Sequence, residues 1–199
     1  MKKGIFLFAL CCFYFAGKAS PHQLFSKAAW RVSISNHAIS MPTRPVNGQW
    51  QPGLELSYIA RIKNSEKTQA LYNQFAIGYF AHRSLQRVSY LKYGIGYTWI
   101  LNAKWFLRPS LNLSTLGVWN SNEEFTYSGS GQYQKHSPFS VQAMPSIGLE
   151  SVFLFANKGA YRWGWLLRYE FGVQGPFSIL SSILPVNQFY TGIQLKKNK

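Results

Sequence analysis

Large apolar side chains alternate with small or charged ones along most of this chain. In residues 161–174, seven large residues occupy every second position from Tyr161 to Val173, with charged residues and glycines mostly between them. Successive side chains of an extended strand point to opposite faces of a sheet. Large aromatic groups on one face and small or charged groups on the other are typical of a transmembrane β-barrel strand whose aromatic face meets lipid.

The same alternation predicts eight strands along the chain. Most have ten or more residues, as a tilted membrane strand requires, whereas globular strands are nearer five or six. They are predicted at residues 30–36, 53–62, 70–82, 85–101, 104–116, 137–155, 160–174 and 186–195.

The connections between these strands differ in length on the two sides of the predicted sheet. On one side, three of the four connections are long (37–52, 117–136 and 175–185), and on the other side all are short. Short periplasmic turns and long external loops are the outer-membrane arrangement. We therefore predict an all-β fold, an eight-stranded antiparallel up-and-down transmembrane β-barrel.

The first 19 residues have the pattern of a secretory signal peptide. Lys2 and Lys3 precede an apolar stretch, and Gly17 and Ala19 place small residues at positions −3 and −1 of a cleavage site. The apolar stretch is too short to cross a bilayer about 30 Å thick. We therefore expect a signal peptide over 1–19 and a single outer-membrane barrel domain over 20–199.

Cysteine and histidine give little support for a metal or cofactor. Cys11 and Cys12 both lie in the predicted signal peptide, so the mature chain has no disulfide, thiolate metal site or cysteine nucleophile. His37 and His136 lie in predicted outer loops without the close spacing of a metal site. The sequence therefore predicts neither a metal nor a cofactor.

The chain is strongly basic, with 21 lysines and arginines, 6 acidic residues and a formal net charge of +15. Such a charge suggests nucleic acid as a partner. The basic residues are dispersed singly, however, and the aromatic residues recur at every second position instead of forming a few stacking platforms. Together with the export signal, this argues against nucleic-acid binding. Anionic lipid, in particular lipopolysaccharide, is the expected partner.

The predicted interior carries charges of both signs. An eight-stranded barrel is just wide enough inside for its own side chains. We expect these charges to form a buried salt-bridge network that fills the lumen, since an unpaired buried charge is costly. Its members are Glu55, Glu150, Glu170, Arg61, Lys92, Arg108, Arg162 and Arg168. The alternative is a proton or ion path, which would make the protein a narrow channel.

Within this network, Glu150 and Glu170 are expected to pair with arginines. The candidates are Arg108, Arg162 and Arg168.

In strand number, strand length and loop asymmetry, the chain resembles the small eight-stranded outer-membrane barrels of Gram-negative bacteria, the OmpA/OmpX-type scaffold. The resemblance implies a monomer in the outer membrane, in contact with lipid and lipopolysaccharide and inserted by the outer-membrane assembly machinery. Such barrels commonly finish on an aromatic residue. This chain instead ends with Leu195 and a basic tail, and its last aromatic residues are Phe189 and Tyr190.

His82 and Ser84 form the candidate catalytic pair. Lipid A deacylases of the outer membrane use a His-x-Ser pair in which the histidine activates the serine toward a lipid ester, and the chain resembles that family at these two residues and in its barrel. Leu85 stands where that family has an asparagine, and the adjoining strands offer no acidic residue to orient His82. The alternative is an outer turn whose polar side chain meets lipid headgroups.

These observations favour a non-enzymatic outer-membrane protein of structural or binding type, without an open pore. Its external loops are expected to contact lipopolysaccharide or an extracellular partner. A deacylase-like enzyme using His82 and Ser84, and a narrow channel, are the alternative functions.

Overall fold

The computed structural model of the protein describes ten segments of the chain. They are residues 28–39, 51–66, 69–82, 86–102, 104–121, 125–127, 133–135, 137–158, 161–176 and 183–197. The predicted signal peptide, Ser84 and His136 lie outside the described residues.

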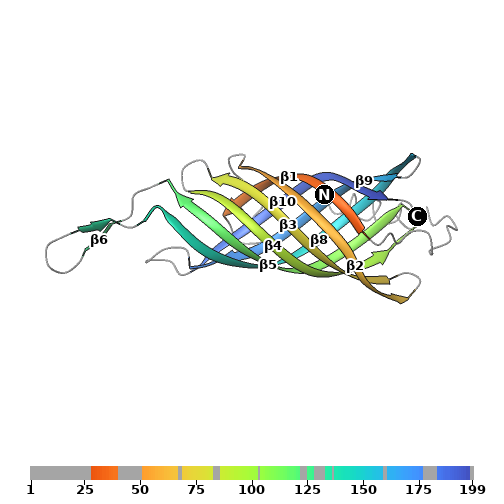
Figure 1. The fold of residues 1–199 in the computed structure, drawn as a ribbon, viewed down its shortest axis with the longest axis horizontal. Helices are drawn as coiled ribbons and strands as arrows, with labels where there is room; N and C mark the ends of the chain where they lie inside the picture. Colours follow the sequence, from red (N-terminus) through yellow and green to blue (C-terminus); the bar gives the residue numbers. More distant parts are fainter. Residues whose placement is uncertain are drawn as a thin grey trace, which may run out of the picture.

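Eight long strands close into an antiparallel barrel (Figure 1). They are β1 (Ala28–Ile39), β2 (Pro52–Glu66), β3 (Gln69–His82), β4 (Gln86–Ile100), β5 (Trp105–Asn120), β8 (Phe139–Lys158), β9 (Tyr161–Gln174) and β10 (Leu184–Lys197). Each pairs with the next along the barrel wall, and β1 pairs with β10 to complete the ring. The predicted fold is therefore confirmed. No helix among the described residues is long and apolar enough to cross a membrane.

The barrel has two unlike ends. One, here called the loop end, receives the connections that follow β1, β3, β5 and β9, and the other, the turn end, receives those that follow β2, β4 and β8. At the loop end two short strands, β6 (Phe125–Tyr127) and β7 (Tyr133–Lys135), form a separate hairpin that projects from the barrel (Figure 1). The sequence had predicted only a loop here, because strands of three residues are too short to show an alternating pattern.

The outer wall carries the large apolar side chains, as the alternation predicted. Trp30, Leu91, Leu111 and Trp165 have half or more of their surface exposed. A polar atom of an outward aromatic residue can be hydrogen-bonded to a neighbouring strand. The indole N–H of Trp165, for example, donates to the Thr191 hydroxyl over 2.8 Å. Such a surface suits lipid, which offers no partner for a free polar group.

The interior is less uniformly polar than the alternation suggests. A cluster of buried apolar residues fills the lumen toward the loop end: Phe80, Val88, Tyr90, Leu116, Val118, Met144 and Val186. A second cluster fills it toward the turn end: Phe106, Val152, Leu154 and Leu166. The charged side chains in contact with Glu55, Glu150 and Glu170 lie between the two clusters, whereas Lys196, also buried, lies at the turn end with its ammonium 5.9 Å from the centre of the Phe106 ring. On β8, for example, Met144, Glu150 and Val152 follow one another down the lumen and belong to the first cluster, the charged layer and the second cluster.

Glycine on neighbouring strands makes room for the large inward residues. Gly78 is paired in register with Tyr90, and a side chain added at Gly78 would collide with the tyrosine ring. A large inward side chain is therefore paired with a glycine on the neighbouring strand. The periodicity of a single strand cannot show this pairing.

Candidate functional site

The centre of the lumen holds four charged side chains in mutual contact. The Lys92 ammonium lies 3.0 Å from a Glu55 oxygen and 2.8 Å from a Glu170 oxygen. The Arg168 guanidinium lies 2.7 Å from the other Glu55 oxygen and 3.5 Å from Glu170. All four side chains are at most 3% exposed. They form an alternating ring of two cations and two carboxylates, in which each charge faces two of opposite sign.

A second group of charges surrounds Glu150. Arg31 donates to both of its carboxylate oxygens, over 2.5 and 2.6 Å, and Arg108 donates to one of them over 3.2 Å. The Gln194 side-chain oxygen accepts from both guanidiniums, over 3.1 Å from Arg31 and 2.8 Å from Arg108. Two-pronged arginine–carboxylate contacts are the strongest form of such pairs.

Hydroxyl groups complete the hydrogen bonding of the carboxylates. Tyr90 donates to Glu55 over 2.9 Å, and Ser146 donates to Glu170 over 2.5 Å. The Tyr190 hydroxyl accepts from Lys92 over 3.2 Å, and the Arg168 guanidinium stacks over the Tyr190 ring at 3.8 Å. A buried ion pair is tolerated only when its remaining hydrogen-bonding groups are satisfied in this way.

Six of the eight residues assigned to the lumen from the sequence take part in these contacts: Glu55, Lys92, Arg108, Glu150, Arg168 and Glu170. Arg61 and Arg162 have the same inward parity but lie nearer the turn end, half-buried.

Arg31 is the residue that sequence reasoning missed. Its inward parity on β1 was visible, but its partner Glu150 lies on β8, separated from β1 by β9 and β10. Contacts across a lumen depend on strand tilt and side-chain reach, which parity alone does not give.

Chemically, the charged layer is enclosed. Apolar side chains pack on its loop-end side and on its turn-end side, and its four cations and three carboxylates contact one another. An ion crossing the barrel would have to pass both apolar clusters and displace these pairs. The arrangement therefore suits a structural filling of the lumen better than a conduit.

His82 lies at the loop end of β3 with its side chain inside the barrel. It is 1% exposed, and its ring meets the Phe80 ring edge-on at 5.4 Å. The ring of His82 therefore faces the lumen and not the lipid, while the rest of the predicted outer turn lies outside the described residues. A base in this position is also separated by the barrel wall from the ester of a membrane lipid. Ser84 is not among the described residues.

The described residues contain no group of three or more His, Cys, Asp or Glu side chains arranged around a metal ion.

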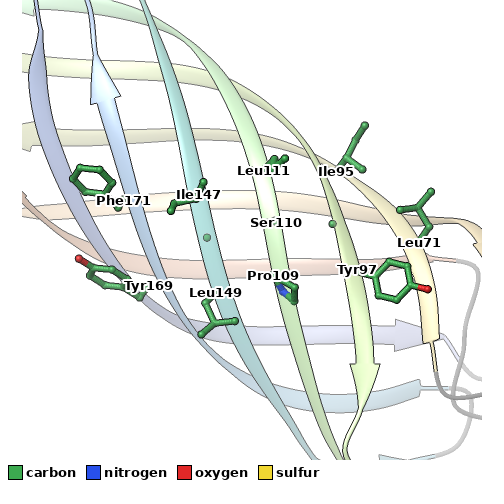
Figure 2. Close-up of a pocket in the computed structure, with 12 residues that line it drawn as sticks. Leu71, Ile95, Tyr97, Pro109, Ser110, Leu111, Ile147, Leu149, Tyr169 and Phe171 are labelled. Atoms are coloured by element: carbon green, nitrogen blue, oxygen red, sulfur yellow. The ribbon is translucent and has the colours of Figure 1, made fainter. Parts of the chain in front are cut away.

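The lipid-facing wall contains a hollow of about 820 Å³ over β3, β4, β5, β8 and β9. Figure 2 shows Tyr97 and Leu71 on one side of it, Tyr169 and Phe171 on the other, and the short Pro109 ring between them. Gly96, Ser110 and Gly148 are register neighbours beneath it. The hollow therefore arises where small residues meet on three adjacent strands, and its nearly all-apolar lining faces acyl chains.

Comparison with known proteins supports the fold. No protein-family pattern and no curated protein sequence matches the chain. Among solved structures, Neisserial surface protein A is similar with a TM-score of 0.53 and 8% identity, covering 86% of this chain and 97% of that one.

Two further solved structures are more distant in shape. A de novo designed transmembrane β-barrel has a TM-score of 0.45 and 8% identity, over 88% of this chain and 98% of its own. Ail, the attachment invasion locus protein of Yersinia pestis, in complex with the heparin analogue sucrose octasulfate, has a TM-score of 0.44 and 15% identity, over 85% and 99%. The closed eight-stranded barrel and its similarity to Neisserial surface protein A show that the chain has the fold of small outer-membrane barrels.

Proposed function

We propose that this chain is an exported outer-membrane barrel of structural or binding type, monomeric and without a continuous pore. The observation that carries the proposal is the layered lumen, with a charged layer held between two apolar clusters. A barrel filled in this way leaves its loop end and its lipid-facing wall as the surfaces on which partners can act.

Lipopolysaccharide is the partner that the outer wall favours. Arg87 is an exposed, outward-facing charge at the loop end of β4, and its register partner on β5 is the exposed Trp119. An arginine beside an aromatic residue at the membrane interface is suited to a lipid phosphate, because its guanidinium can donate two hydrogen bonds while its stem covers apolar surface.

The pore-free part of the proposal is tested by conductance. Protein refolded in detergent and reconstituted in planar bilayers should give no steady single-channel currents. Stable channels of porin size would contradict the proposal and would instead support transport.

The lipopolysaccharide part is tested by binding. Refolded wild-type protein should bind lipopolysaccharide, and Arg87→Ala should weaken this binding. Lys104→Ala is the matched control, because Lys104 is also exposed but lies at the turn end. Equal losses in both variants, or none in either, would reject Arg87 as a lipopolysaccharide contact.

A further inference from the structure

The loop end of the lumen brings two histidines and a glutamine into one row across three strands. The His37 backbone N–H of β1 donates to the Gln51 carbonyl oxygen over 3.1 Å. Gly53 of β2 pairs with Phe80 of β3, so extending this antiparallel register by two residues sets Gln51 beside His82. Gln51 has the inward parity of Gly53 and Glu55. The three residues therefore lie at one level, inside the mouth of the barrel.

Each of these side chains has a buried polar atom without a hydrogen-bond partner. The atoms are Nδ1 of His37, Oε1 of Gln51 and both ring nitrogens of His82. His37 and His82 are 0% and 1% exposed. Buried polar groups in proteins are nearly always paired with protein or with ordered water. Each of the three residues therefore has an atom that can offer a lone pair to a partner shared between them, since a neutral imidazole keeps one acceptor nitrogen and the amide oxygen is an acceptor.

The local packing prepares His37 for this role. Its Nε2 lies 2.8 Å from the Ser35 hydroxyl, and its ring stacks on Phe80 with centroids 3.9 Å apart and planes 15° apart. In the tautomer whose Nε2–H donates to the serine oxygen, Nδ1 keeps an unshared lone pair. A hydrogen bond to the opposite ring nitrogen is the usual way in which proteins orient a metal-binding histidine.

The separation of the two rings fits a single ion. The His37 and His82 centroids lie 6.5 Å apart, with ring planes at 84°. Two imidazoles whose nitrogens each lie about 2 Å from one ion have ring centres roughly 5–6 Å apart, so a small rotation of His82 brings both into range. Neither ring nitrogen of His82 has a hydrogen-bond partner among the described residues, so that rotation breaks no hydrogen bond with them.

We propose that His37, Gln51 and His82 form a binding site for a divalent transition-metal ion, such as Zn²⁺, at the loop-end mouth of the lumen. Two imidazole nitrogens and one amide oxygen are a donor set that suits zinc, copper or nickel better than calcium or magnesium. Water would complete the coordination, since three protein ligands leave a tetrahedral ion one open position.

The test uses mature protein refolded in detergent without a polyhistidine tag and titrated with ZnCl₂ by isothermal calorimetry. Wild type is expected to bind one equivalent of Zn²⁺ and no Mg²⁺. His37→Ala and His82→Ala should each weaken Zn²⁺ binding at least about tenfold, and Gln51→Ala should weaken it less. His22→Ala and His136→Ala are the matched controls, which remove the two other histidines of the chain.

A circular dichroism spectrum dominated by strand must first show that each variant is folded. Zn²⁺ binding no stronger than Mg²⁺ binding would overturn the proposal. Binding lost in His22→Ala or His136→Ala, but kept in the His37 and His82 variants, would overturn it equally.

Discussion

Arg31 and Glu150 face each other across the lumen in a two-pronged ion pair, with nitrogen–oxygen distances of 2.5 and 2.6 Å, although they are 119 residues apart and lie on strands that are not neighbours. The side chains are 1% and 3% exposed. The pair crosses the lumen between β1 and β8, past β10 and β9, so its removal should lower the stability of the whole barrel.

Replacing Arg31 by alanine should destabilise the barrel strongly. The substitution leaves Glu150 with Arg108 alone, and breaking one side of a buried ion pair costs about 3–5 kcal/mol. Urea titration of the refolded protein, followed by tryptophan fluorescence, measures the loss. Arg162→Ala is the control, because Arg162 is half-buried near the turn end and outside the charged layer. A loss equal to that of the control would contradict the assigned role.

Adding a methyl group at Gly78 should also destabilise the fold. The new Cβ would lie within collision distance of the Tyr90 ring, whose hydroxyl donates to Glu55, so the ring must move and the hydrogen bond must weaken. Overpacking of this kind costs about 1–3 kcal/mol. Gly117→Ala is the matched control, since the nearest atom to its added Cβ is 3.4 Å away, in the Phe139 ring. If Gly78→Ala is as stable as Gly117→Ala, the packing described here is wrong.

A charge on the lipid-facing wall should be poorly tolerated. Leu111 is 69% exposed at the middle of β5, where its surroundings are lipid. Leu111→Arg should lower the stability of the barrel in lipid vesicles by about 2–4 kcal/mol, as expected for arginine near the bilayer midplane. Leu111→Phe keeps the apolar surface and should change stability little. An unchanged stability of the arginine variant would show that this face does not meet the bilayer.

Lipid A from cells that express the protein should keep all of its acyl chains. The reason is the position of His82 inside the lumen, where the wall separates it from membrane lipid. Mass spectrometry of lipid A from cells with wild type, His82→Ala and Ser84→Ala measures this directly. Loss of an acyl chain with wild type, and with neither variant, would contradict the prediction and identify the catalytic pair.

The fold could be predicted from the sequence because the alternation of inward and outward side chains can be seen in each strand separately. Lipid requires an apolar outer face on all eight strands, so the two-residue period recurs independently in each of them. The predicted strand at 30–36 was too short at both ends, because Ala28, Ala29 and Ala38 add no contrast between the faces.

The lumen could be predicted only in part. Parity identified which charges point inward, but not which meet, since Arg31 reaches Glu150 past two intervening strands. It also missed the apolar layers, because Phe80 and Tyr90 are inward residues of the size expected on the outer face. Phe80 and Tyr90 fit inside because the register pairs them with Gly53 and Gly78 of the adjoining strands.

The pairing of β1 with β10 has a consequence for how the barrel assembles. The two strands pair from Ala29 with Lys196 to Ile39 with Val186, so the seam joins the two ends of the described chain. Arg31 contributes to the charged layer from β1, and its partners Gln194 and Glu150 stand on β10 and β8. In an open sheet that lacks only this seam, Arg31 would be parted from both partners, and Glu150 would keep only Arg108. Partly closed forms are therefore costly, and closure should be an all-or-none step that occurs once both end strands are in place.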